Sequence, residues 1–174
     1  MRSTVSVEVA APPELVFAIA RDVERWPRLL PHYVRVDVEK RQDDGVVVAR
    51  MVARRTLLPV LGLGLPVAWR SRSWNEPEAR RLRFVHLGGA TNGMDVTWRI
   101  EPADGGCHVS IEHDFRPRVG PWAPIVDRFF TRPIAGRTLA TFKALAEALA
   151  EAPAETSPDP VAKSARPSRT NQPA

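Results

Sequence analysis

Two histidines of the 174-residue chain, His86 and His113, lie in strand-like segments whose neighbours on the same face are apolar. An imidazole exchanges protons near neutral pH, so either side chain is a candidate for proton transfer. A lone histidine on an apolar face is more often a hydrogen-bonded part of the structure. The residues by themselves leave both interpretations open.

Other kinds of chemistry find little support in the sequence. The four histidines and the single cysteine, Cys107, show no spacing typical of metal ligands, and one cysteine excludes an internal disulfide framework. Gly62 and Gly64 lack the rest of a dinucleotide-binding or Walker-type loop. We therefore expect neither a metal nor a cofactor.

The most informative segment runs from Asp22 to Tyr33. A helix leads into Trp26-Pro27, and an aromatic residue then precedes a strand, an arrangement that generic packing rarely produces. It indicates a cavity for a hydrophobic ligand. Trp26 either plugs the sheet or contacts the ligand, and the Tyr33 hydroxyl reaches either the cavity or solvent and backbone.

The elements that position these residues can be predicted from apolar periodicity. Val5, Val7 and Val9 alternate as in a strand, and Pro12-Pro13-Glu14 then opens a helix. Its buried side is expected to hold Leu15, Val16 and Ile19, with Phe17 nearer the margin. A second short helix ends before Pro31, because the residue that precedes proline disfavours the α conformation.

Turn signals divide the middle of the chain into six antiparallel strands. Their expected ranges are about 33–41, 45–56, 67–74, 80–88, 92–102 and 106–116. Met94 and Trp98 share one face of the fifth of these strands, and Phe84 and His86 share a face of the fourth. Those faces should meet the core or a cavity.

Helical spacing returns in the C-terminal part of the chain. Leu139, Phe142 and Leu149 recur at helical intervals, and Pro133 predicts a break near 131–133. Beyond residue 150 the composition is rich in Pro, Ala, Ser and Thr. We expect one domain over 1–150 and a disordered tail over 151–174.

The segment 57–67 is almost wholly apolar although it carries the glycines and prolines of a loop. Loops normally run over the surface in contact with water, so this one should fold over something, enter a membrane interface or pack on a partner. A lid over the mouth of a cavity is the favoured interpretation, and a lipid carrier would use the same segment to approach a bilayer.

Composition sets the outer limits. A chain that is 44% hydrophobic and 26% charged makes one globular domain, and no apolar run reaches the roughly 18 residues that a membrane span needs. The first residues alternate polar and apolar, unlike a signal peptide, so we expect a cytoplasmic protein. The net charge of +5 comes from scattered bases rather than from a basic stripe, so we expect no nucleic-acid partner.

The order of these elements is that of an α+β helix-grip fold, in which a curved antiparallel seven-stranded sheet wraps around a long C-terminal helix and two short helices follow the first strand. Over residues 1 to about 150 the chain resembles the START-like (Bet v 1-like) superfamily of polyketide cyclases and lipid-transfer proteins. The likeness is closest to the aromatase/cyclase branch of the polyketide cyclase/dehydrase proteins. It rests on Asp22, Trp26-Pro27, Tyr33, Trp69, the Met94-x-x-x-Trp98 strand and the Gly105-Gly106 turn.

The resemblance implies a cavity in which a linear poly-β-ketone closes to a ring by aldol chemistry and then loses water. Its catalytic candidates are Tyr33 and an inward arginine. An ungapped count places Ser73 at the arginine's position, which leaves Arg70 and Arg72 as nearby candidates. Strand alternation turns both away from Trp69 unless a bulge intervenes.

The residues expected to contact the ligand are Trp26, Trp69, Ser73, Phe84, His86, Met94, Trp98, His113 and Phe129. The resemblance also allows a second function, the non-catalytic transfer of a lipid or an isoprenoid quinone. The candidate partners besides the ligand are an acyl carrier protein and a membrane surface reached through 57–67. Convergent polar groups in the cavity would favour chemistry, and a wholly apolar wall would favour transport.

Overall fold

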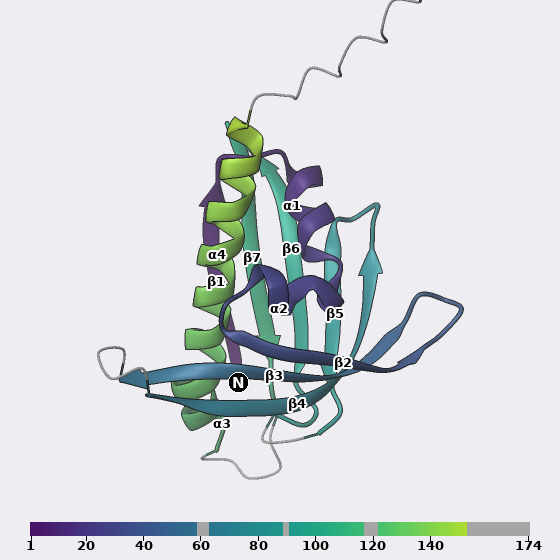
Figure 1. Ribbon diagram of the computed structural model, residues 1–174, viewed down its shortest axis with the longest axis vertical. Helices are drawn as coiled ribbons and strands as arrows, with labels where there is room; N and C mark the ends of the chain where they lie inside the picture. The colour runs from purple at the N-terminus through teal and green to yellow at the C-terminus, as the bar shows by residue number, and fades with distance from the viewer. Residues whose placement is uncertain (59–62, 89–90, 117–121, 153–174) are drawn as a thin grey trace, which may run out of the picture.

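The computed structural model describes residues 1–58, 63–88, 91–116 and 122–152. Within them, seven antiparallel strands form one sheet in the order β1-β7-β6-β5-β4-β3-β2. Strands β2, β3 and β4 run crosswise to β1, β6 and β7, and the long helix α4 lies along one face of the sheet (Figure 1). This confirms the expected helix-grip architecture, whereas the expected tail lies almost wholly outside the described residues.

The strands are β1 Arg2–Val9, β2 Tyr33–Arg41, β3 Val47–Leu58, β4 Leu63–Glu76, β5 Arg81–His86, β6 Asp95–Ala103 and β7 Gly106–Asp114. The helices are α1 Pro13–Ala20, the 3-10 turn η1 Val23–Arg25, α2 Trp26–Leu29, α3 Trp122–Val126, the π-helical turn η3 Asp127–Thr131 and α4 Arg132–Glu151.

The short helices form where their end signals predict them. Pro13 lies in the first turn of α1, where no backbone N–H is needed, and the Asp22 side chain caps η1 by accepting a hydrogen bond from the Glu24 N–H at 3.2 Å. The buried residues of α1 are Val16, Phe17 and Ala20. Phe17 was expected near the margin, but the helix turns it towards the core.

The apolar segment 57–67 is largely strand rather than loop. Strands β3 and β4 stay paired as far as Leu58 and Leu63, with a register shift between Thr56 and Leu58. Pro66 is tolerated because β4 pairs with β5 only from Ser71 onward, so no second neighbour needs its missing N–H. Most of the segment that was predicted to form a lid is therefore part of the sheet. Residues 59–62, the rest of the predicted lid, lie outside the described part of the chain.

The break expected near residue 132 is a change of helix type. Helices α3 and α4 are joined through the π-helical turn η3, and Val126, Thr131 and Arg132 all keep right-handed helical backbone angles. Pro133 stands in the first turn of α4, directly after the π-helical turn, so its missing N–H falls at the junction between the two helix types. The helical run therefore continues through the predicted break.

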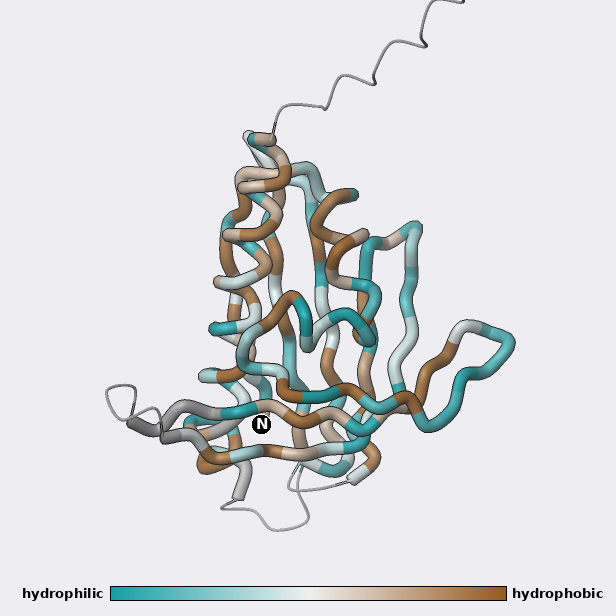
Figure 2. Tube along the Cα trace, viewed as in Figure 1, coloured by the Kyte–Doolittle hydropathy of each residue, from teal (hydrophilic) through white to brown (hydrophobic). Residues whose placement is uncertain are grey.

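The main core lies between the sheet and the helices. The trace of α1 is mostly hydrophobic and that of α4 mixes hydrophobic and hydrophilic residues, whereas the turn between β2 and β3 is largely hydrophilic (Figure 2). The buried residues of α4 include Leu139, Phe142 and Ala146. Helix α4 contacts β1, α1 and β3. Where the start of β3 pairs with the second half of β4, the small residues Ala49 and Ser71 are buried on the inner face of the sheet. Their small volume leaves room for the large aromatic side chains on that face.

Candidate functional site

A cavity of about 80 Å³ lies between the inner face of the sheet and α4. Its described walls are Trp26, Tyr33, Met51, Val67, Trp69, Phe84, His86, Thr91, Met94, Val96, Trp98, Ile111, His113, Thr131, Ile134, Ala135 and Thr138. None of these carries a carboxylate, an ammonium or a guanidinium group, so the described wall suits an uncharged ligand.

Trp26 both lines the cavity and holds it together. Its ring centroid lies 5.0 Å from Tyr33, 5.7 Å from Phe84 and 5.5 Å from Trp98, and its indole N–H donates to the Ala20 carbonyl at 2.9 Å. The N–H is thereby satisfied, and the apolar faces are left for packing. The two sequence-based readings of Trp26, plug and ligand contact, are therefore compatible.

Tyr33, at the start of β2, presents a buried hydroxyl to α4. The phenol forms a hydrogen bond with Thr138, which also lies 2.8 Å from His32 Nε2 and donates to the Ile134 carbonyl at 2.9 Å. Burial raises the pKa of Tyr33 and lowers the pKa of His32 to about 4, so both side chains are uncharged at neutral pH. The strand and the helix thus share one buried polar network.

A second polar group enters from β7. His113 is 7% exposed, and its ring forms a hydrogen bond with the Ser3 backbone in the neighbouring strand β1. Its Nδ1 is buried and has no hydrogen-bond partner among the described residues. Burial lowers the pKa of His113 to about 4, which keeps the ring neutral.

Two charged side chains, Asp127 and Arg132, lie close to His113. The Ser3 hydroxyl donates to Asp127 at 2.7 Å, and Arg132 pairs with the same carboxylate at 2.7 Å. Asp127 begins the π-helical turn and Thr131, which lines the cavity, ends it. The carboxylate favours a positive charge on His113, while burial opposes it more strongly. His113 is therefore a neutral base, and the nearby Asp127 carboxylate would stabilise its protonated form.

His86 forms the third polar point. Its Nδ1 lies 2.7 Å from the Thr91 hydroxyl, and its ring stacks on Trp69 at 5.7 Å between centroids. Burial, followed by the nearby His113, lowers the pKa of His86 to about 3. The Nδ1 of His86 has this partner, whereas the Nδ1 of His113 has none among the described residues, so the role of His86 is better explained by positioning of the Trp69 wall.

The two arginine candidates do not reach the cavity. The register between β3 and β4 is unbroken from Val47–Ser73 to Thr56–Gly64, so no bulge reverses the alternation there. Arg70 pairs with Glu39 on the outer face at 2.5 Å, and Arg72 lies over the Trp74 ring. Neither arginine is therefore among the described residues of the cavity wall, and their catalytic role stays a prediction without a contact in this structure.

The expected ligand contacts divide clearly. Seven of them line the cavity: Trp26, Trp69, Phe84, His86, Met94, Trp98 and His113. Ser73 is buried but lies outside the described lining, with a 3.4 Å contact to the Val47 carbonyl, and Phe129 is 45% exposed. Alternation explains the first group, whereas Phe129 lies in the π-helical turn, where normal helical spacing fails.

Thr138 is the most consequential residue that the sequence interpretation missed. It stands between Ala135 and Phe142 on the buried side of α4, so a polar residue interrupts an apolar helical stripe. That interruption was a readable signal for a functional group. His32, its partner 106 residues away, carried no such signal.

The described residues contain no group of three or more His, Cys, Asp or Glu side chains that could hold a metal ion. Among the same residues, no helix is long and apolar enough to cross a membrane.

Comparison with known proteins places this fold and cavity in a family. Residues 1–152 match the family model described as polyketide cyclase/dehydrase and lipid transport, and the chain belongs to that family. The solved Zhui aromatase/cyclase of a Streptomyces species has the same fold, with a TM-score of 0.70 and 20% sequence identity over 84% of this chain and 93% of that one.

Two Streptomyces proteins are similar in sequence. A putative polyketide cyclase of Streptomyces cyaneus is 29% identical over 127 residues, which are 72% of this chain and 78% of the relative. The granaticin polyketide synthase bifunctional cyclase/dehydratase of Streptomyces violaceoruber is 31% identical over 117 residues, or 66% of this chain. The match spans only 34% of that longer relative.

Proposed function

We propose that the protein binds an uncharged polyketide-type chain in its cavity and promotes ring closure and dehydration. The observation that carries this proposal is the buried Nδ1 of His113, which has no partner among the described residues and belongs to a residue that lines the same aromatic and aliphatic wall as Tyr33. A carrier of lipids or quinones would need no such convergent polar groups. The Streptomyces relatives named as polyketide cyclases support the same class of ligand.

The described residues provide a route for the protons. A β-ketone in its enol form donates its O–H to His113 Nδ1, and the enol carbon attacks a carbonyl carbon of the same chain. His113 takes the enol proton as the carbon–carbon bond forms and returns it to the new alkoxide. Loss of that hydroxyl together with an adjacent carbon-bound proton then releases one molecule of water.

The aromatic walls determine which carbons meet. With the arginines on the outer face, no described cation stabilises the new alkoxide, so positioning and the proton transfer by His113 must supply most of the acceleration. The cavity is also small for a chain of several rings. We therefore expect its walls to separate when the ligand binds.

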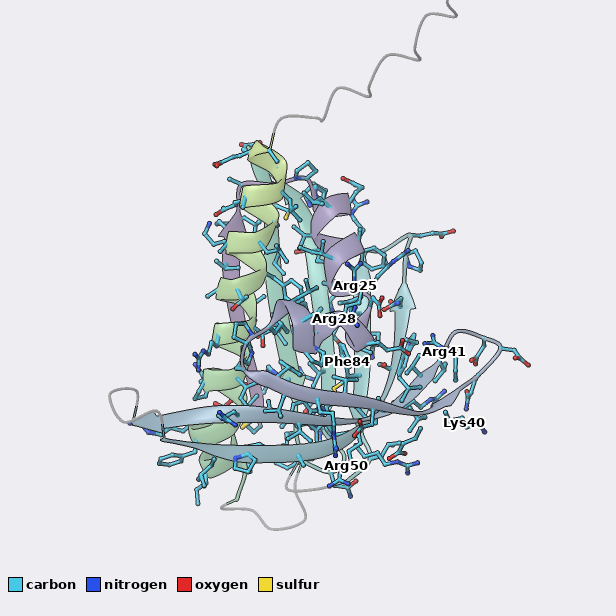
Figure 3. The ribbon with its side chains drawn as sticks, viewed as in Figure 1. Arg25, Arg28, Lys40, Arg41, Arg50 and Phe84 are labelled. Atoms are coloured by element: carbon cyan, nitrogen blue, oxygen red, sulfur yellow. The ribbon has the colours of Figure 1, made fainter. Side chains whose placement is uncertain are left out.

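Delivery by an acyl carrier protein is part of the proposal. Arg25, Arg28, Lys40 and Arg50 are exposed on η1, α2, β2 and β3 (Figure 3). These side chains can attract an acidic carrier protein. Leu65 is half-exposed on β4 and could instead touch a membrane surface, but four cations favour the carrier protein. The cytoplasmic location stays a prediction.

The test uses a synthetic linear poly-β-ketone thioester, with the rate and the distribution of ring-closed products measured by liquid chromatography and mass spectrometry. The wild-type protein should change both relative to buffer. Replacement of His113 by Gln should lower the accelerated rate by about 10²-fold or more. If the Tyr33 hydroxyl also donates to the new alkoxide, Tyr33→Phe should abolish turnover with little loss of binding.

Arg70→Gln is the matched control, because Arg70 lies on the outer face, and it should keep the wild-type rate. If the wild-type protein gives the same rate and products as buffer, the proposed catalysis is wrong. Wild-type turnover by Tyr33→Phe would remove that residue from the mechanism.

A further inference from the structure

The two edge strands of the sheet differ in how well they are protected from pairing with another chain. Strand β2 is rich in charged side chains and has two register shifts against β3, and both features discourage a further strand. Strand β1 keeps an unbroken register with β7 from Arg2 to Val9 and has no charged residue from Ser3 to Val7. Figure 1 shows β1 at the edge of the sheet, beside α4. Of the two edges, that of β1 is therefore the one suited to pairing.

The neighbours of β1 show which of its backbone groups point away from β7. The Met1 amine donates to the Phe115 carbonyl at 2.6 Å, and the Phe115 N–H donates to the Met1 carbonyl at 2.8 Å. Hydrogen-bonded pairs alternate along an antiparallel ladder, so the odd residues of β1 bond to β7 and the even residues point outward. Among the described residues, the outward N–H and C=O groups of Thr4 and Ser6 have no partner.

Side chains of α4 occupy the outward side only at the end of β1. The Lys143 ammonium donates to the Glu8 carbonyl at 2.6 Å, and the Glu147 carboxylate accepts from the Ala10 N–H at 2.8 Å. Both groups belong to even residues, in agreement with the alternation.

Earlier along β1, a groove separates the strand from α4, and its helix side carries the small residues Gly136, Ala140 and Ala144. Gly136 is close to the middle of the strand, because a Cβ built on it would lie 4.0 Å from Val5 Cγ1. The helix therefore projects little beside the unpaired part of the edge.

The sequence of this edge complements itself in one antiparallel register. A two-fold axis at Val5 places Arg2 opposite Glu8 of a second copy and Thr4 opposite Ser6 of that copy. Each of these pairs joins residues whose backbone groups point outward, as a hydrogen-bonded pair requires. The Glu8 carbonyl can accept the new bond as well as that of Lys143, because its oxygen has two lone pairs.

The charged ends of the strand are available for this pairing. The Arg2 and Glu8 side chains are 82% and 71% exposed. Each already has one neighbour in its own chain, Asp114 at 3.3 Å from Arg2 Nε and His108 at 2.5 Å from Glu8 Oε1. The other guanidinium nitrogens and the second carboxylate oxygen remain for a partner.

We infer that two copies of the protein pair through β1 in this register and form one continuous sheet, with the two α4 helices side by side on the same face. Opposite charges and Thr–Ser pairs directly across the strands stabilise such an edge, and the small residues of α4 let the helices approach. Pairing moves β1, whose Ser3 backbone bonds to His113, from the edge of a sheet to its interior.

Sedimentation equilibrium in low salt, up to a protein concentration of about 1 mM, tests the inference. The wild-type protein should dimerise. Thr4→Pro removes an outward N–H from each copy, which an edge strand tolerates, and should weaken the dimer about tenfold or more. Thr4→Val keeps the N–H and is the matched control, so its dimerisation should match the wild type.

A charge exchange tests the register itself. Arg2→Glu places like charges together twice and should weaken the dimer about tenfold. Adding Glu8→Arg to it restores opposite charges and should return the affinity to within about threefold of the wild type. Amide hydrogen exchange at Thr4 and Ser6 should also slow as the protein concentration rises, whereas exchange at Asp44, in the turn between β2 and β3, should not change.

A wild-type protein that stays monomeric at about 1 mM overturns the inference and leaves this edge for a strand of another protein. A dimer that Thr4→Pro does not weaken, or whose charge exchange gives no recovery over Arg2→Glu alone, overturns it as well. If Thr4→Pro does not fold, the charge exchange and the exchange rates at Thr4 and Ser6 decide.

Discussion

The two faces of strand β4 differ in charge: the inner face carries neutral side chains, and the outer face carries arginines. On the inner face, Trp69 and Ser71 lie against buried aromatic and neutral side chains. On the outer face, Arg70 pairs with Glu39, and Arg72 lies over Trp74. Figure 3 labels Phe84 of β5, which is buried, and Arg50 of β3, which is exposed and points outward. Strands β5 and β3 are the two neighbours of β4.

This contrast shows that chemistry in this molecule depends on uncharged groups. The inner histidines are held neutral by burial, and the guanidinium groups remain where water can solvate them. A charged arginine in this cavity would need a buried partner, and the described wall offers no carboxylate. The two faces should therefore respond very differently to substitution.

The largest difference is expected between two tryptophans. Trp26→Ala removes a buried ring that touches Tyr33, Phe84 and Trp98, and should lower the free energy of unfolding by about 3–5 kcal/mol. Trp74→Ala on the outer face loses mainly its contacts with Arg72 and Arg83, worth about 1 kcal/mol. Urea denaturation of both variants measures the difference, and equal losses would contradict it.

Acid should destabilise the inner face next. His32, His86 and His113 have pKa values of about 4, 3 and 4 in the folded protein, below the ordinary 6.5 of the unfolded chain. The unfolded state therefore binds more protons between these values, and stability falls as the pH drops from 6.5 towards 4. Each histidine contributes at most about 1.4 kcal/mol per pH unit.

Thermal denaturation at pH 7.5, 6 and 5 checks this expectation. The melting temperature should fall over that range, and His113→Gln should fall less steeply than the wild-type protein because one titrating group is gone. A melting temperature independent of pH would show that these rings are not held neutral by the fold.

The smallest effect is expected from the outer ion pair. Glu39→Gln removes the partner of Arg70 where both side chains are at least a third exposed, and should change the free energy of unfolding by less than about 1 kcal/mol. High salt should reduce even that difference. The free energy of unfolding would be measured by urea denaturation in low salt. A loss above about 2 kcal/mol would show that the Arg70–Glu39 pair contributes more to stability than its exposure indicates.

Alternation was the part of the sequence that predicted most. It placed Met94, Trp98 and His113 on the inner face and turned Arg70 outward, although the family resemblance favoured an inward arginine. The residue-level rule was the better guide here because strand geometry leaves a side chain only two directions unless the register shifts.

Two features could not be predicted in the same way. The segment 57–67 is apolar on both faces, so its strand period was hidden, and only pairing with β3 makes it a strand. The link between His32 and Thr138 joins α4 to the start of the sheet across 106 residues. Such a contact depends on how the helix rests on the sheet, which no local pattern encodes.

The π-helical turn Asp127–Thr131 sets the rotational orientation of α3 relative to α4. It brings Asp127 to Ser3 and Thr131 to the cavity within five residues. An α-helix turns about 100° per residue, so deletion of one residue here, which would restore α-helical geometry, would rotate α3 by that angle relative to α4. The carboxylate behind His113 and the wall of the cavity are thus set by a single inserted residue.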